Sequence, residues 1–148
     1  MYRLSFAILG NEADAIDATQ ESLVAAWRRL RDIREPERFD AWLQRIVVNA
    51  ARQVMRANRR RRAREIPASV APLPASLAKA PPDDAAVLDS ALLTLPIEQR
   101  SILVLHHLEG RAIAELAEIL AIPAGTAKSR LFAARRALAV AIARETSG

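Results

Sequence analysis

Apolar residues at the start of the chain recur at the spacing of α-helices. Leu4 and Ile8 lie one helical turn apart, and Gly10 after them is a typical helix stop. A second series recurs at intervals of seven, four and three residues: Ile16, Leu23, Trp27 and Leu30. The pattern predicts a short first helix and an amphipathic second helix over about residues 14–30.

A third helix is predicted after Pro36, because Arg34, Glu35 and Pro36 interrupt the pattern before a new one begins. Its apolar positions follow the i, i+3, i+4, i+7 rule: Phe39, Trp42, Leu43, Ile46, Val47, Ala50 and Val54. The same helix is expected to continue into a strongly basic tract.

The basic tract, residues 52–64, contains seven arginines and no acidic residue. Cations near a helix C-terminus interact favourably with the helix dipole, so a solvated helix end is one interpretation. Seven arginines far exceed what such capping needs, which favours binding to nucleic-acid phosphates. The arginines are Arg52, Arg56, Arg59, Arg60, Arg61, Arg62 and Arg64.

A proline-rich segment divides the chain. Five of the eight prolines fall in residues 66–82, together with many Ala and Ser residues. Repeated prolines remove backbone donors and prevent a continuous helix. This predicts a linker over residues 66–82 between a first domain, residues 1–65, and a second domain, residues 83–148.

The second domain is predicted to hold four shorter helices. Asp83 is an acidic residue suited to a helix N-terminus, and Pro96 can occupy the first turn of the next helix. Gly110 ends that helix, and Pro123 precedes the last one. The predicted spans are about 83–95, 97–108, 112–120 and from 125 onward. The expected fold class is all-α, with two small helical domains joined by a Pro/Ala-rich linker.

Composition agrees with a helical chain that binds a polyanion. Of 148 residues, 51% are hydrophobic and only 4% aromatic, so strand-forming residues are sparse. The formal net charge is +5, which favours nucleic acid as a partner ahead of an anionic membrane. The chain has no cysteine, which excludes disulfides and Cys-ligated zinc. No apolar run reaches the roughly 18 residues of a membrane span, so we expect a cytoplasmic protein without membrane insertion.

The last two helices predict a helix-turn-helix, whose second helix enters the major groove of DNA in many regulators. Ala127, Leu131, Ala134 and Leu138 fall within one narrow stripe of that second helix. The opposite face offers a guanidinium, a hydroxyl and an aromatic ring, which suit DNA contact. It consists of Gly125, Ser129, Phe132 and Arg136, flanked by Lys128, Ala133 and Arg135. An ordinary helix pair with a solvated basic face is the alternative.

An acidic-polar stripe marks the second predicted helix: Asp14, Asp17, Gln20 and Glu21. On a basic protein this stripe is unsuited to DNA, so it indicates either a protein partner or a solvated surface.

His106 and His107 are adjacent and lack an acid at metal-ligand spacing on their helix face, so we expect a surface or packing role. No nucleophile triad, Gly-rich phosphate loop or paired-carboxylate motif stands out. We therefore predict that the protein is not an enzyme and that it has no cofactor and no metal site.

Four segments, in order, resemble the extracytoplasmic-function sigma factors, the smallest class of bacterial sigma factor. The segments are DAIDATQE (14–21) ending in AWR (26–28), FDAWL (39–43) followed by Ile46 and Asn49, LPIEQR (95–100) with LEG (108–110), and IPAGTAKSRL (122–131). The resemblance covers nearly the whole chain and includes a linker where the family has one. It implies a non-enzymatic initiation factor whose partners are core RNA polymerase, promoter DNA and, in some cases, an anti-sigma factor.

The resemblance also assigns roles to the first domain. The polymerase-docking helix would carry Asp14, Asp17, Gln20 and Glu21, with Trp27 buried. The loop at residues 32–38 lies where the family captures a flipped base of the melted strand. The residues implied to read and open the downstream promoter element are Trp42, Asn49, Arg52, Arg56, Arg59 and Arg60.

In the second domain the resemblance implies readout of the upstream promoter element. The residues concerned are Gly125, Thr126, Lys128, Ser129, Arg130, Phe132, Arg135 and Arg136. Ala133 stands where the family often has Arg. Ala121 stands where the family usually has a turn Gly. If that turn is left-handed, the alanine strains the backbone by about 1 kcal/mol.

Two further expectations complete the prediction. The family has an additional helical stretch before the position of Met1, so the first helix is expected to be short. An autonomous helix-turn-helix regulator that binds operators without polymerase is the alternative function. That alternative accounts for residues 83–148 but assigns no role to the acidic stripe.

Overall fold

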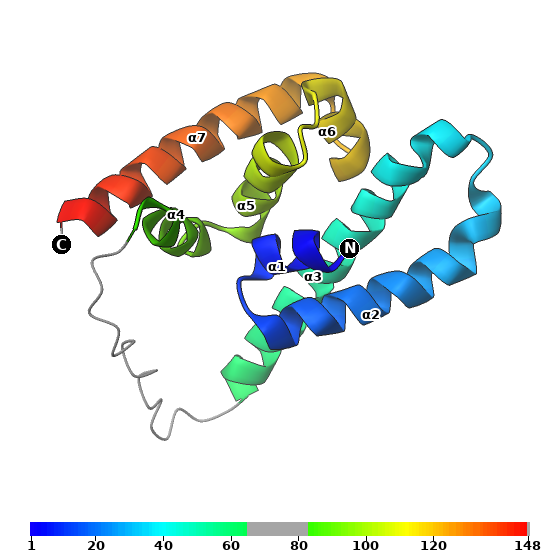
Figure 1. Ribbon diagram of the computed structural model, residues 1–148, viewed down its shortest axis with the longest axis horizontal. Helices are drawn as coiled ribbons and strands as arrows, with labels where there is room; N and C mark the ends of the chain where they lie inside the picture. The colour runs from blue at the N-terminus through cyan, green and yellow to red at the C-terminus, as the bar shows by residue number, and fades with distance from the viewer. Residues whose placement is uncertain (65–82, 148) are drawn as a thin grey trace.

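The computed structural model describes residues 1–64 and 83–147, and every regular element in these ranges is helical (Figure 1). The first part contains α1 (Tyr2–Leu9), α2 (Glu12–Arg29), two short turns, η1 (Leu30–Asp32) and η2 (Pro36–Arg38), and α3 (Phe39–Arg64). The second contains α4 (Asp84–Leu93), α5 (Ile97–Leu103), a π-helical turn, η3 (Val104–Leu108), α6 (Ile113–Leu120) and α7 (Ala124–Ser147). The predicted all-α fold class is confirmed. The predicted linker, residues 66–82, lies outside the described residues.

The junction between α1 and α2 follows the predicted stop. Gly10 has φ of 80° and its N–H donates to the Phe6 carbonyl, which ends α1 in a left-handed cap. The side chain of Asn11 then accepts a hydrogen bond from the backbone N–H of Asp14 at 2.9 Å and caps α2. Glycine also gives space here, because a Cβ at Gly10 would collide with the side chain of Leu93 on α4.

The apolar stripe of α2 is not its packing face, which corrects the prediction. The buried residues are the small ones, Ala15, Ala18 and Ser22, which lie where α2 packs on α1 and α3. Small side chains let helix axes approach closely, so they make the contact while larger neighbours point outward. The predicted burial of Trp27 is wrong: its side chain is 81% exposed, and Leu23 is 52% exposed.

The predicted helix over residues 97–108 is also interrupted. Regular α-helix ends at Leu103, and η3 continues with the wider π spacing, in which the N–H of Glu109 donates to the carbonyl of Val104. Gly110 then adopts φ of 68° and turns the chain toward α6. The π-helical turn places His106 and His107 next to α7.

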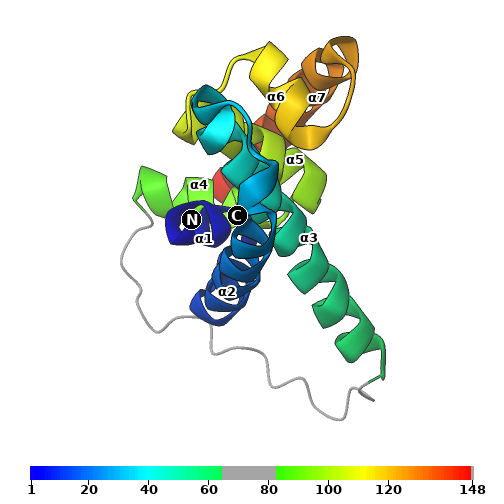
Figure 2. The same cartoon turned by 90° about the vertical axis from the view of Figure 1, so that its right-hand side faces the viewer.

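The two parts share one hydrophobic core. Figures 1 and 2 show α1 between the helices of the first part and α4 and α5 of the second. Helix α1 contacts α5 and η3, and α3 contacts α6. Buried residues from both parts belong to one cluster, among them Leu4, Ile8, Val47, Leu105 and Leu116. The predicted domains therefore pack directly on each other.

Arg100 is buried at this seam, with 5% of its surface exposed. Its Nη1 donates to the carbonyl of Ile8 at 2.7 Å, and its Nε donates to the carbonyl of Leu95 at 3.1 Å. Carbonyls in the last turn of a helix lack intrahelical donors, so the guanidinium of α5 satisfies the end of α1. A charged donor makes these bonds stronger than neutral ones.

Ala121 ends α6 in the left-handed conformation, with φ of 55° and ψ of 48°. It is the one non-glycine residue with positive φ among the described residues. The Cβ of an L-residue crowds the following carbonyl in this conformation, at a cost of about 1–2 kcal/mol. The condition under which the sequence predicted strain at Ala121, a left-handed turn, is therefore met.

We predict that Ala121→Gly raises the free energy of unfolding by about 1 kcal/mol, because glycine adopts this conformation without a Cβ clash. Urea denaturation of the full chain measures the change. The matched control is Ala133→Gly, which alters an exposed residue within α7 and should lower stability by about 0.5–1 kcal/mol. Equal destabilisation by both substitutions would contradict the strain at Ala121.

Candidate nucleic-acid interface

Helices α6 and α7 form a helix-turn-helix. The buried and exposed residues of α7 lie on the two faces that the sequence predicted. Ala127, Leu131 and Ala134 are buried, and Leu138 is half-buried against the core. The opposite side, which we call the outer face of α7, is open to solvent. Its exposed members are Gly125, Lys128, Ser129, Arg130, Phe132, Arg135 and Arg136, while Thr126 at its edge is half-buried.

The outer face presents an aromatic ring with a cation above it. Phe132 is 62% exposed, and the guanidinium carbon of Arg136 lies 5.9 Å from its ring centroid. Stacking of this kind orients the planar guanidinium and leaves its N–H groups free to donate. The hydroxyl of Ser129, an exposed residue, donates to the Gly125 carbonyl at 3.0 Å.

Arg135 differs from its neighbours because it is held by both histidines. Its Nη2 lies 3.0 Å from Nε2 of His106, and its Nε lies 3.4 Å from Nε2 of His107. Burial, followed by the charges of His106 and Arg135, lowers the pKa of His107. The sequence predicted only a surface or packing role for these histidines, because a contact across 28 positions leaves no periodic signal.

The predicted downstream-element residues follow α3. Asn49, Arg52 and Arg56 line a groove of about 560 Å³ between α2 and α3, in which Gln20 and Glu21 of α2 also lie. Nε of Arg52 is buried there without a hydrogen-bond partner. The groove thus brings together residues that the sequence assigned separately to DNA and to polymerase. Farther along α3, Arg59 and Arg60 are exposed.

The loop before α3 borders a second hollow, of about 300 Å³. Trp42 is half-buried there, with its ring centroid 5.8 Å from that of Phe39. Glu118 of α6 closes one side, and its Oε1 lies 3.5 Å from Nη1 of Arg38. The lining residues are Asp32, Ile33, Arg34, Glu35, Arg38, Ala41, Trp42, Arg45 and Glu118.

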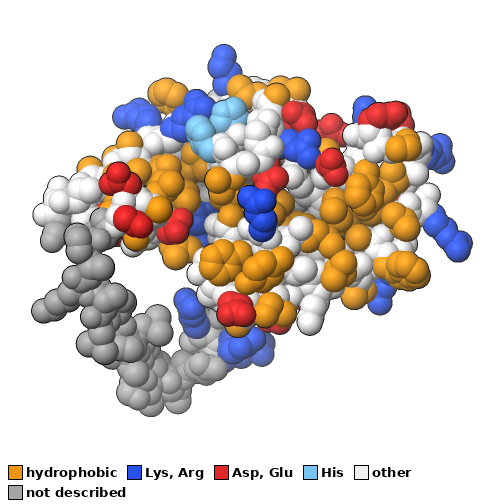
Figure 3. Space-filling view, in the orientation of Figure 1, with side chains coloured by type: hydrophobic (Ala, Val, Ile, Leu, Met, Phe, Trp, Pro, Cys, Tyr) orange, Lys and Arg blue, Asp and Glu red, His pale blue; other side chains and the backbone are white. Residues whose placement is uncertain are grey.

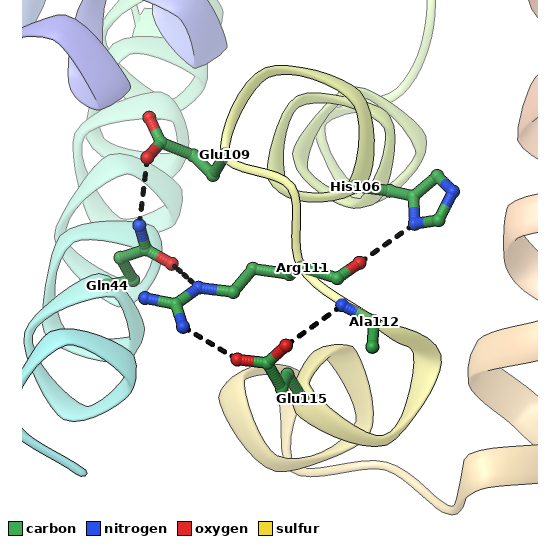
Figure 4. Close-up of polar contacts among 6 residues, drawn as sticks. All are labelled: Gln44, His106, Glu109, Arg111, Ala112 and Glu115. Carbon is green, nitrogen blue, oxygen red and sulfur yellow. Dashed lines mark hydrogen bonds and ion pairs between the residues drawn. The ribbon is translucent and has the colours of Figure 1, made fainter. Parts of the chain in front are cut away.

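A polar network joins α3 to the turn before α6 (Figure 4). Nε of Arg111 donates to Oε1 of Gln44 at 2.7 Å, and its Nη1 pairs with Glu115 at 2.7 Å. The backbone N–H of Ala112, and then Arg111, lower the pKa of Glu115 by hydrogen bonding to its carboxylate. Gln44 also donates to Glu109 at 3.1 Å. Arg111 therefore connects the helix-turn-helix with the helix predicted to melt DNA.

The acidic stripe and the exposed apolar residues lie together on α2. Asp17, Gln20 and Glu21 are exposed, and Asp14 is half-buried with its carboxylate accepting from Asn11 at 2.7 Å. Figure 3 shows hydrophobic side chains gathered where α2 meets the start of α3. The exposed apolar members are Leu23, Val24, Trp27, Leu30 and Phe39. An acidic surface beside exposed apolar side chains is suited to a protein partner.

Among the described residues no three His, Asp or Glu side chains are arranged to hold a metal ion. Within residues 1–64 and 83–147 no helix has the length and apolarity needed to cross a membrane.

Two sigma-factor models match the chain in order. Residues 1–61 match "Sigma-70 region 2" and residues 85–138 match "Sigma-70, region 4". The chain is 36% identical over 143 residues to the ECF RNA polymerase sigma factor SigM of Mycobacterium tuberculosis, covering 94% of this chain and 69% of SigM. It is 31% identical over 154 residues to SigE of Mycolicibacterium smegmatis, covering 99% of this chain but 59% of SigE. The chain is therefore considerably shorter than this relative.

Solved structures share the arrangement of helices. The sigma factor RpoE, in complex with the anti-sigma factor NepR from Bartonella quintana, superposes with a TM-score of 0.73 at 26% identity. That match covers 95% of this chain and 88% of RpoE. CnrH, in complex with the cytosolic domain of CnrY, gives a TM-score of 0.63 at 28% identity, covering 94% of this chain and 77% of CnrH.

The two faces of α7 should respond differently to truncation. Leu131→Ala removes buried methyl groups and should destabilise the chain by about 2–5 kcal/mol through a core cavity. Arg136→Ala removes only the exposed stacking of Arg136 on Phe132, so it should lower the free energy of unfolding by less than about 1 kcal/mol. Urea unfolding of both variants measures this. Similar losses would mean that the outer face is part of the fold.

Proposed function

The chain belongs to the extracytoplasmic-function sigma factors, and we propose that it binds core RNA polymerase and directs promoter-specific initiation of transcription. The observation that carries this proposal is the match to two sigma regions in their proper order, over residues 1–61 and 85–138. Each region here has a surface suited to one of the tasks, an acidic and apolar one on α2 and a basic one on α7.

Helix α2 is the proposed docking surface for polymerase. Exposed Asp17, Gln20 and Glu21 supply the polar contacts, and Trp27 supplies a large apolar side chain. Exposed aromatic residues of this kind are frequent energetic centres of protein interfaces. An anti-sigma factor is a second proposed partner, because the similar sigma factor RpoE was solved in complex with the anti-sigma factor NepR.

Promoter DNA is the proposed ligand of α3 and α7. On α3, Trp42, Asn49 and Arg52 are proposed to act on the downstream element together with Arg56, Arg59 and Arg60. On α7, the outer face is proposed to enter the major groove of the upstream element. Arginines supply phosphate and guanine contacts there, since their planar donors match both groups.

The proposed factor has no catalytic step of its own and acts in the cytoplasm, where core polymerase performs the chemistry. An autonomous helix-turn-helix regulator is not favoured, because it would need only the second part of the chain. The match over residues 1–61 would then have no function.

Run-off transcription separates the two proposals. Core polymerase with the full chain should select promoters from a randomised library and initiate at defined positions, whereas core alone should not. Binding of a preferred duplex by the chain without polymerase, together with no stimulation of transcription, would support the autonomous regulator instead.

Charge reversal on α2 should weaken docking. Asp17→Lys with Glu21→Lys is expected to lower the affinity for core polymerase at least about tenfold, with a change in stability within about 0.5 kcal/mol per residue. The control, Asp89→Lys with Glu145→Lys, makes the same charge change at exposed positions on α4 and α7. Fluorescence anisotropy with purified core measures both. Equal weakening would indicate a general charge effect rather than a docking surface.

Truncation of the stacked arginine should weaken DNA binding. Arg136→Ala in the assembled polymerase is expected to cost about 1–3 kcal/mol of upstream-element binding and to relax the preference at one base pair, if the side chain reads a base. If it binds a phosphate, affinity should fall evenly across sequences and the salt slope should decrease by about one. Unchanged affinity and salt slope would exclude the outer face from DNA contact.

A further inference from the structure

The only two histidines of the chain lie side by side against α7. Their rings meet edge to face with centroids 4.8 Å apart, and both Nε2 atoms point to the guanidinium of Arg135. The distances are 3.0 Å from Nη2 of Arg135 to His106 and 3.4 Å from its Nε to His107. Figure 3 shows the histidines, in pale blue, at the surface beside basic side chains.

The tautomer of His106 follows from its other contact. Nδ1 of His106 lies 2.8 Å from the backbone carbonyl of Arg111 (Figure 4). A carbonyl only accepts, so Nδ1 must carry the hydrogen. In a neutral imidazole Nε2 then holds a lone pair, and a guanidinium only donates, so Arg135 donates to this nitrogen. The backbone of Arg111 thus sets His106 as an acceptor for Arg135.

Protonation would remove this arrangement. A protonated imidazole has N–H groups on both nitrogens, so it cannot accept from Arg135 and repels its charge. Burial is the largest cause that lowers the pKa of His107, and the nearby guanidinium of Arg135 acts in the same direction, so the accepting form is favoured near neutral pH.

The other charged groups around η3 are engaged elsewhere. Arg100 of α5 binds backbone carbonyls, Glu115 of α6 binds Arg111, and Glu109 accepts from Gln44. The remaining charged side chains on α1, α5 and α6 are Arg3, Glu98 and Glu118. Besides Arg135, α7 carries Lys128, Arg130, Arg136, Arg144 and Glu145. Within the described residues, Arg135 is the charged side chain that hydrogen-bonds both imidazoles.

The contacts restrict how Arg135 can meet DNA. Its Nε and one N–H of Nη2 are engaged by the histidines, which leaves both N–H groups of Nη1 and the second N–H of Nη2 outside these contacts. Holding a long side chain in one orientation removes part of the rotamer entropy that binding would otherwise cost. A guanidinium fixed in this way suits a phosphate at the edge of the groove that the outer face of α7 is proposed to enter.

We propose that His106 and His107, as neutral imidazoles, are positioning residues that orient Arg135 toward a phosphate of the upstream promoter element and release it on protonation. This inference rests on the proposed function, since it requires α7 to bind DNA. It assigns the histidines a role in promoter binding without direct contact to DNA.

A double-mutant cycle tests the proposal in the full chain assembled with core polymerase, on a duplex selected by run-off transcription. At pH 8, His106→Ala with His107→Ala should weaken binding about three- to tenfold, and should have no further effect once Arg135 is Ala. Arg136→Ala is the matched control on the same helix, and its effect should add to that of the histidine change. Additive effects with Arg135→Ala would overturn the proposal.

The pH profile separates positioning from direct contact. His106→Gln with His107→Gln retains amide acceptors and cannot be protonated, so its affinity should match the wild type at pH 8. Between pH 8 and pH 6 the wild type should lose affinity relative to the Gln pair. A relative gain for the wild type would overturn the proposal, because it would mean that protonated histidines bind phosphate themselves.

A titration of the free chain by NMR tests the cluster without DNA. Arg135→Ala should raise the pKa of His107 toward the ordinary value of 6.5, because a neighbouring positive charge is removed, whereas Arg136→Ala should leave it unchanged. If the pKa of His107 is the same in Arg135→Ala as in the wild type, the positioning role is overturned, even if the wild-type assembly binds the promoter normally. Absence of promoter binding by the wild-type assembly would instead overturn the proposed function, whatever the titration shows.

Discussion

Arg100 of α5 lies buried against the last turn of α1, where its guanidinium donates to the carbonyls of Ile8 and Leu95. A buried cation is unfavourable unless its donors are satisfied, so the bond to Ile8 holds α5 against α1, while the bond to Leu95 is local to the start of α5. Gly10 keeps the same region close-packed, because a Cβ there would force the side chain of Leu93 on α4 to shift. The docking in turn brings α6 onto α3, where Arg111 reaches Gln44 and Glu118 approaches Arg38. The hollow beside Trp42 and the orientation of Arg111 both depend on this seam.

The packing of α2 explains how the surface proposed to dock polymerase can exist on so small a chain. Ala15, Ala18 and Ser22 make the contacts with α1 and α3, and the hydroxyl of Ser22 donates to the Ala18 carbonyl at 2.6 Å. These side chains need little width, so the rest of the helix is free to carry the acidic stripe and large apolar residues. The cost is exposed hydrophobic surface, and large exposed apolar patches typically mark sites where a partner binds.

Periodicity predicted those features that depend on neighbours along the chain. It located the stop at Gly10, the start after Pro36 and the faces of α7, because each follows from local backbone chemistry or from a regular spacing of Leu and Ala. It failed for the apolar stripe of α2, since hydrophobicity alone does not reveal that Ala15, Ala18 and Ser22 form the contact. It also could not find the bonds of Arg100 to Ile8 or of Arg111 to Gln44, whose partners lie 92 and 67 positions apart. Contacts of that kind depend on tertiary packing, and the histidine cluster at Arg135 belongs to the same class.

The two tryptophans of the chain occupy very different surroundings, and this gives the molecule built-in optical probes. Trp27 is almost fully solvated on α2, so its fluorescence emission should be red-shifted, as for an indole in water. Trp42 is half-buried in the hollow that α6 helps to enclose. Separation of α6 from α3 would expose Trp42 while leaving Trp27 in water. Emission from the native indoles can therefore follow occupancy of the α2 surface and opening of the seam as two distinct signals, without an attached dye.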